Sequence, residues 1–391
     1  MPELKISLLH PSIKVISVTG KNPVTIEAEH HGATQCPHCD SPRLRKKDRI
    51  CRRVRHETIG LRICWIQLTL RKHQCLDCGR YFRERIPGLL PYKRSTEHFR
   101  RQVYTLHHDG LSQSTLHERV EIAPATVERW FHELLERKER EFSSRCCPVV
   151  MGIDEHYFSR KDGYVTTFAD LHKGRVFELA LGRSQHALHR ALSRMKGRHR
   201  VRVICIDLSP TYRAVIRRYF PNARIVSDRF HVVRLLLQHF LESWKQLDPV
   251  GRKNRGLLSL MRRSATKLSP EQKLRLKAYF KEHPAVGALY EAKEELHQLL
   301  SIKHQTKRGC RPLIRELLQW ITRLKESPLR SMQTLGSTLN SWKEEIACMW
   351  RFTKNNGVTE GLHTKMEMIQ RRAFGFRNFK NYRLRVIVLC G

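Results

Sequence analysis

The fold of this chain is decided by residues 201–233, VRVICIDLSPTYRAVIRRYFPNARIVSDRFHVV. The apolar run 203–206 predicts a buried strand that ends on Asp207, followed by a helix. A second short strand then ends on Asp228, which opens another helix. Because burying an unpaired carboxylate costs free energy, acids at the ends of buried strands indicate a site, often one for a metal ion.

Composition points to a polyanionic partner. Among 391 residues, Lys and Arg number 74 and Asp and Glu number 37, so the net charge is +37 and is spread along the whole chain. Nucleic acid is therefore the expected partner, and a basic scaffold is a weaker alternative because the hydrophobic content is 40%. No apolar run approaches the roughly 20 residues that span a bilayer, and the first residues do not form a signal peptide. We expect a cytoplasmic protein without a membrane partner.

The cysteines predict a metal site in place of a disulfide framework. Cys36-Pro-His-Cys39 and Cys75-Leu-Asp-Cys78 are two CxxC pairs separated by strand-like sequence, which is typical of a zinc ribbon. Replacement of one Cys ligand by His38 or His73 is a lesser alternative. Basic residues around these pairs predict phosphate contacts, with a solvated face as the alternative; they are Arg43, Arg45, Lys46, Lys47, Arg52 and Arg53.

Between residues 95 and 141 the apolar residues recur with helical spacing. The break EIAPAT between two short helical segments fits a helix-turn-helix, whose second helix would direct Thr126, Glu128 and Arg129 toward the DNA major groove. An ordinary three-helix linker is the alternative interpretation.

Three strands are then predicted at 149–155, 164–169 and 175–181, and the first ends on Asp154. With the two strands of residues 201–233, this order predicts an α/β fold with an RNase H-like core, in which Asp154 and Asp207 end neighbouring strands. Residues 235–350 contain helical segments without a convincing strand, so an all-helical insertion is expected. We divide the chain into a zinc-ribbon domain (1–94), a helix-turn-helix domain (95–145), the first part of the core (146–234), the insertion (235–352) and the last part of the core (353–391).

A final helix is predicted to begin near Glu360, and the closing VIVLC resembles a strand. Asp154, Asp207 and Glu360 could converge on Mg²⁺ or Mn²⁺, because hard divalent cations prefer oxygen ligands. Single acids at strand ends are more often caps or ion pairs, but the basic, cysteine-paired first half favours a site. Asp228 could replace Asp207 as a ligand; we prefer a supporting role for Asp228 and for His231, although a structural role for His231 is equally compatible.

Basic and aromatic residues alternate near the end of the chain, a pattern that suits a nucleic-acid backbone and stacked bases. The basic members with a predicted DNA contact are Lys365, Arg371, Arg372 and Arg377. Several of the aromatic residues could instead belong to the core.

The chain resembles the ISL-three family of bacterial insertion-sequence DDE transposases. The resemblance rests on CPHC…CLDCGRYF, GIDE, ICIDLSPTY, VSDRFHVVR and NNGVTEGLHTKMEMIQRRAFGFRNF. It implies that Asp154, Asp207 and Glu360 are the catalytic, magnesium-binding triad, with structural zinc on the four cysteines. It also implies cleavage at the terminal inverted repeats of an insertion sequence, strand transfer into target DNA, a homodimer or higher oligomer on DNA and nucleoid association. The alternative is a catalytically silent DNA-binding protein derived from a transposase.

Overall fold

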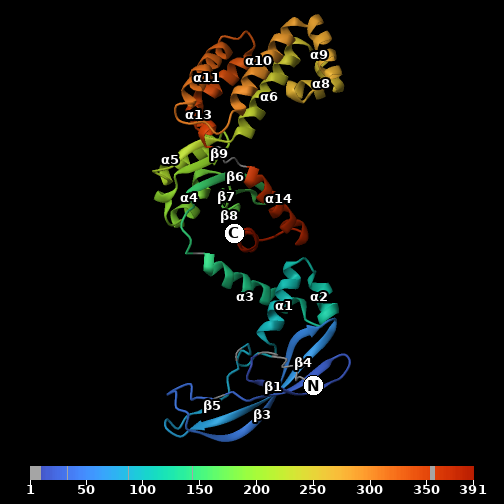
Figure 1. The fold of residues 1–391 in the computed structure, drawn as a ribbon, viewed down its shortest axis with the longest axis vertical. Coiled ribbons are helices and arrows are strands. Elements are labelled where there is room, and N and C mark those ends of the chain that lie inside the picture. The colour runs from blue at the N-terminus through green and yellow to red at the C-terminus, as the bar shows by residue number, and fades with distance from the viewer. Residues whose placement is uncertain (1–9, 33, 87, 143, 353–356) are drawn as a thin grey trace. The chain divides into compact units, whose positions relative to one another are not determined.

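The computed structural model describes residues 10–32, 34–86, 88–142, 144–352 and 357–391. The chain divides into two compact units, Met1–Lys138 and Glu139–Gly391. In Figure 1 the first unit runs from blue to cyan-green and the second from green to red.

The first unit begins with a sheet in the order β1-β2-β4-β3, with β5 paired to β4. Its strands are β1 (Ile13–Thr19), β2 (Val24–His30), β3 (Leu44–Ile59), β4 (Arg62–Cys75) and β5 (Tyr81–Arg83). β1 and β2 pair in antiparallel orientation as a hairpin. β3 and β4 form a long antiparallel hairpin in which Leu44 lies opposite Cys75, so the hairpin's open end carries the cysteine pairs. Apolar side chains such as Val54, Ile66 and Leu68 bury one face.

Three helices complete the first unit: α1 (Glu97–His108), α2 (Gln113–Val120) and α3 (Pro124–Phe142). Thr96 and Ser112 cap the first two by accepting hydrogen bonds from backbone N–H groups. The turn before α3 has Glu121 at a left-handed φ of 49°. Arg55 of β3 donates to the carbonyl oxygen of Val120 at 2.8 Å, so the sheet and the helices of this unit are packed together.

The second unit is built on a mixed sheet in the order β10-β9-β6-β7-β8. Its strands are β6 (Val150–Ser159), β7 (Gly163–Asp170), β8 (Arg175–Leu181), β9 (Val203–Ile206) and β10 (Arg224–Ser227). β10, β9 and β6 are parallel neighbours, whereas β7 and β8 continue from β6 as an antiparallel meander. All five predicted strands of this part are confirmed.

Helices cover both faces of this sheet. On one face α4 (Gln185–Arg194) and α5 (Pro210–Tyr219) bury Leu188 and Tyr212 against Ile153 and Ile204. On the other face α14 (Gly357–Arg372) and α15 (Phe379–Cys390) pack on the strands through a second apolar cluster. The sheet is therefore the middle of three layers, which buries the β9 strand on both sides.

One prediction, that of a strand-like end of the chain, is wrong. The closing VIVLC is the last part of α15 and not a strand. Asn378 caps this helix by accepting from the backbone N–H of Lys380, and Tyr382, Val386 and Cys390 recur every four residues on its buried face. An apolar run of β-branched residues favours a strand locally, but the helical spacing and the apolar face of the sheet determine the outcome.

Between β10 and α14 the described residues form helices, as predicted. They are α6 (Arg229–Leu247), α7 (Pro249–Lys253), α8 (Arg255–Arg262), α9 (Pro270–Glu282), α10 (Pro284–Ser301), α11 (Cys310–Lys325), α12 (Arg330–Ser341) and α13 (Lys343–Arg351). Single 3-10 turns lie at Ala265–Lys267 and, before β9, at Arg198–Arg200. In Figure 1 the long helix α6 leads from the sheet into this helical block. No helix among the described residues is long and apolar enough to cross a membrane.

Arg229 joins the helical block to the start of α6. Its buried guanidinium donates to the carbonyl oxygens of Leu300, Ile302 and Met349 at 2.8–3.1 Å, near the ends of α10 and α13. We expect Arg229→Met to lower the free energy of unfolding by about 3 kcal/mol, because three buried carbonyls lose a charged donor. Urea unfolding measures this value. Arg234→Met, on the exposed side of α6, is the matched control and is expected to change stability by less than about 0.5 kcal/mol.

Candidate functional site

Three aspartates lie in one row across the parallel strands of the second unit. β6 and β9 pair Gly152 with Cys205, so continuing this register by two positions sets Asp154 level with Asp207. β9 and β10 pair Ile206 with Ser227, and the next position sets Asp207 level with Asp228. The row therefore follows from strand register: each aspartate belongs to a different strand or follows it directly.

The row is an electrostatically strained group of carboxylates. Burial, with smaller contributions from Asp207 and Asp228, raises the pKa of Asp154 to about 6, against the opposing backbone N–H of Glu155 and the charge of His231. Burial also raises the pKa of Asp207. The Oδ1 atom of Asp207 is buried and has no hydrogen-bond partner among the described residues. Buried oxygens of this kind suit a divalent cation, which would offset both the burial and the mutual repulsion.

Asp228 and His231 lie close together at the start of α6. Asp228 is 3% exposed and caps α6 by accepting from the backbone N–H of Phe230. The Nε2 atom of His231 lies 3.7 Å from Oδ2 of Asp228, one helical turn along. This pair fixes the start of α6 beside Asp207. The same position keeps Asp228 available as an alternative ligand.

Glu360 lies in the first turn of α14 and is exposed. It does not join Asp154 and Asp207 in a tight group of ligand atoms, since the described residues contain such a group only at the cysteines. His363, three residues along the same helix, places its Nδ1 atom 3.9 Å from Oδ2 of Asp154. Residues three apart share one side of a helix, so Glu360 lies about one turn from the Asp154 contact.

A histidine pair beneath Asp154 was not predicted. The hydroxyl of Thr167 lies 3.2 Å from a ring nitrogen of His156 and 3.2 Å from one of His363, and His156 also contacts the hydroxyl of Tyr382 at 2.8 Å. Burial lowers the pKa of His363 to about 4 and that of His156 to about 3, so both are neutral near pH 7. The network attaches α14 and α15 to the strand that carries Asp154. In the sequence, only the spacing of three residues between Glu360 and His363 indicated that His363 lies near the predicted site.

The raised pKa of Asp154 predicts how pH controls cation binding. Its folded-state pKa of about 6 exceeds the ordinary 3.8, so ionisation destabilises the metal-free fold progressively as pH rises between these two values. A divalent cation needs the ionised form and competes with the proton. We expect Mn²⁺ to raise the melting temperature of the second unit at about pH 7.5 and to have little effect at about pH 5. Scanning fluorimetry with and without Mn²⁺ measures this difference; equal shifts at both pH values would contradict it.

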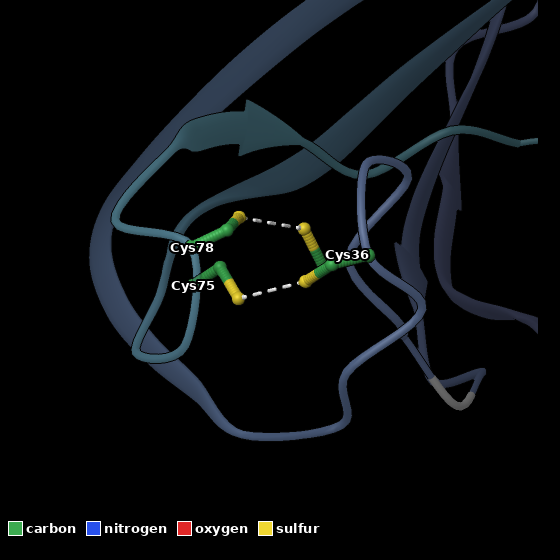
Figure 2. A group of neighbouring side chains, drawn as sticks. Cys36, Cys75 and Cys78 are labelled. Carbon is green, nitrogen blue, oxygen red and sulfur yellow. Dashed lines mark hydrogen bonds between the residues drawn. The ribbon is translucent and has the colours of Figure 1, made fainter.

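Four of the cysteines of the first unit form a second site (Figure 2). Cys36, Cys39, Cys75 and Cys78 place their sulfur atoms within 4.8 Å of one another. The Cys36–Cys78 and Cys39–Cys75 sulfur distances are 3.6 and 3.5 Å, and all four are free thiols. A tetrahedral zinc with bonds of about 2.3 Å requires sulfurs about 3.8 Å apart, so these residues fit a structural zinc ion. Neither His38 nor His73 belongs to the group.

The two CxxC pairs have the same backbone turn. Four positions after the first cysteine of each pair, Asp40 and Gly79 have left-handed φ values of 55° and 68°. This turn directs backbone N–H groups toward the sulfurs: those of Cys78 and Asp77 lower the pKa of Cys75 to about 6. Burial and hydrogen bonds from the neighbouring thiols raise the pKa of Cys39 and of Cys78, so in the metal-free site the negative charge is concentrated on Cys75.

The basic residues predicted to contact DNA are mainly exposed. Arg45, Lys46 and Lys47 are exposed on β3, whereas Arg43 pairs with Asp77 at 2.9 Å. At the start of α3, Arg129 is exposed and Thr126 is partly exposed. Exposed positions in the C-terminal part include Lys365, Arg371, Arg372 and Arg377.

Most aromatic residues of the C-terminal run belong to the core. Tyr382 is fully buried and contacts Phe158 and Phe376. Phe379 packs on Phe158. Phe374 is 94% exposed and is therefore the residue of this run that could stack on a base.

Carboxylates grouped at the edge of a sheet are typical of enzymes that process phosphodiesters with divalent metals. Comparison with known proteins agrees with this class. The family model for ISL-three-type DDE transposases, described as transposase, matches residues 151–386. The chain is 22% identical over 361 residues to the transposase for insertion sequence element IS1001 of Bordetella parapertussis, covering 90% of this chain and 87% of that protein. The chain belongs to the ISL-three family of DDE transposases.

Proposed function

We propose that this transposase binds the terminal inverted repeats of its insertion sequence and catalyses Mg²⁺-dependent DNA cleavage and strand transfer by a DDE two-metal mechanism. The observation that carries the proposal is the register row, in which Asp154 lies level with Asp207 and a buried oxygen of Asp207 has no hydrogen-bond partner among the residues that the structure describes. The strand order β10-β9-β6-β7-β8 supports an RNase H-like core, and the helices between β10 and α14 are its insertion.

In this proposal Asp154, Asp207 and Glu360 are the metal ligands. Bound Mg²⁺ would supply activation of the attacking water or 3′-hydroxyl and stabilisation of the leaving oxygen. Asp154 and Asp207 hold the sheet side of the site, and their shared repulsion favours cation binding. Glu360 approaches from α14, whose position is set by the contacts of His363 with Asp154 and Thr167. Asp228 and His231 fix the first turn of α6 at the edge of the site.

The first unit is proposed as the DNA-binding part. The four-cysteine site holds structural zinc at the end of the β3–β4 hairpin, and α3 is the recognition helix of a helix-turn-helix with Thr126 and Arg129 near its start. Phosphate contacts are assigned to the exposed basic residues on β3 and α14. A homodimer or higher oligomer on DNA is part of the proposal, because two element ends must be held together for strand transfer.

The test uses the DNA that flanks the gene. Short inverted repeats are located on both sides, and a labelled duplex of one repeat is incubated with the full chain and Mg²⁺. We expect binding to this duplex, cleavage at the repeat end and joining of the end to a target plasmid. Binding without cleavage under all divalent metals would favour the catalytically silent DNA-binding protein instead.

A further inference from the structure

The first unit contains a large cleft beside the first cysteine pair, whose Pro37 and His38 belong to its lining. It has a volume of about 1100 Å³ and lies between β3, β4, β5, Ile86 and the segment 88–92. Leu70, Ile86 and Leu89 contribute apolar surface to it, and Tyr81 and Tyr92 are largely exposed aromatic residues in its lining. Arg52 donates to the carbonyl oxygen of Lys93 at 2.7 Å and thereby holds the segment beside the cleft.

The polar lining of the cleft is dominated by positive charge. Arg52, Lys72, Arg83 and Arg85 line it from three strands and the segment after β5. Lys72 lies directly opposite Arg83 in the β4–β5 register, an arrangement that destabilises a sheet when both residues are charged. Burial and the charge of Arg83 lower the pKa of Arg52, so these two cations are also close in space.

The acids of the lining are already bound elsewhere. Glu84 accepts from the backbone N–H of Arg71 at 2.9 Å and lies 3.3 Å from His73, and Glu97 pairs with Arg101 at 3.8 Å. Within the described part of the chain, no acidic side chain forms an ion pair with the four basic residues of the cleft. These positive charges are therefore available to an external anion, since Arg83 and Arg85 are exposed to solvent.

We propose that this cleft binds the phosphodiester backbone of DNA, with Arg52, Lys72 and Arg83 contacting neighbouring phosphates. The inference rests on the proposed function, which supplies DNA as the partner, and it goes further by identifying one face of the first unit and adding Lys72 and Arg83 to the contact residues. Binding relieves the like-charge repulsion across β4 and β5, so the arrangement that costs stability in the free protein increases affinity for DNA.

The salt dependence of DNA binding tests this site. Affinity of the full chain for a fluorescein-labelled terminal-repeat duplex is measured by anisotropy across a series of salt concentrations. For Arg83→Gln and Lys72→Gln we expect affinity to fall about tenfold and the slope of log K against log salt to decrease by about 1 each. Arg62→Gln, which removes the same charge from the exposed start of β4, is the matched control and should keep the wild-type slope.

Thermal stability separates a DNA contact from a structural role. Arg83→Gln removes the like-charge pair, so its melting temperature should equal or exceed the wild-type value, and Arg83→Lys should bind almost as well as wild type. If the wild type binds DNA and both glutamine variants keep the wild-type salt slope, the cleft is not a DNA-binding site. The proposed function would stand in that case. A lower DNA affinity of Arg83→Gln together with a lower melting temperature would indicate a structural role for Arg83. If Arg83→Lys then failed to restore binding, the proposed DNA contact would be contradicted. Absence of DNA binding by the wild type would overturn the proposed function itself.

Discussion

Asp207→Asn is expected to abolish DNA cleavage and to make the metal-free protein more stable. The substitution keeps the shape of the side chain but removes a buried charge whose Oδ1 atom has no hydrogen-bond partner among the described residues. Relief of about 1 kcal/mol would raise the melting temperature by about 2–4 °C for a unit of this size. Loss of several kcal/mol of transition-state stabilisation by the metal corresponds to a fall in cleavage rate of about 10³-fold or more.

Melting temperature and cleavage of a labelled repeat duplex are measured on the same preparation. Asp162→Asn, in the turn between β6 and β7, is the control and should keep wild-type cleavage. Mg²⁺ should stabilise the wild type and not the Asp207→Asn variant. Wild-type cleavage by Asp207→Asn would show that Asp207 is not an essential metal ligand. It would favour Asp228, which lies next in the row, as the ligand.

Cys75→Ser is expected to remove zinc and unfold the open end of the β3–β4 hairpin. Four thiolates on one metal contribute on the order of 10 kcal/mol to small zinc domains. We therefore expect a melting temperature for the first unit that is lower by at least about 10 °C, together with loss of DNA binding. Zinc content by elemental analysis should fall from about one equivalent per chain to none.

Cys51→Ser is the matched control for the zinc experiment. Cys51 is an exposed thiol on β3 of the same sheet and does not belong to the four-sulfur group. Its substitution should leave zinc content and melting temperature unchanged. A Cys75→Ser protein that retains stoichiometric zinc would contradict the assignment of the four ligands.

The elements of the second unit were predictable from sequence because their signals are local. Apolar runs bounded by turn residues predicted the five strands, and Ser209 before Pro210 or Asp228 before the helical period is an ordinary helix start. The acids at strand ends were visible for the same reason. The expected strand order also predicted that Asp154 and Asp207 end neighbouring strands, but the level row that includes Asp228 depends on strand register, which only pairing across the sheet determines.

Long-range contacts explain what sequence reasoning missed. The VIVLC segment is β-branched and apolar, yet its position after the Asn378 cap and its four-residue spacing place it in α15. His156 and His363 are 207 positions apart in the chain, and their rings approach to 5.0 Å only because α14 packs against β6. The cleft of the first unit likewise depends on the pairing of Lys72 with Arg83, which joins β4 to the short strand β5.

The most direct test of the proposed catalytic triad is the cleavage rate of Glu360→Gln on a labelled terminal-repeat duplex with Mg²⁺. Glu360 is exposed and stands about one helical turn from the contact of α14 with Asp154, so its role depends on closing onto the two aspartates when metal and DNA are bound. Glu367→Gln, an exposed position on the same helix, is the control. We predict a loss of about 10³-fold for Glu360→Gln with unchanged DNA affinity, and wild-type cleavage for Glu367→Gln. Wild-type cleavage by Glu360→Gln would contradict the proposed triad.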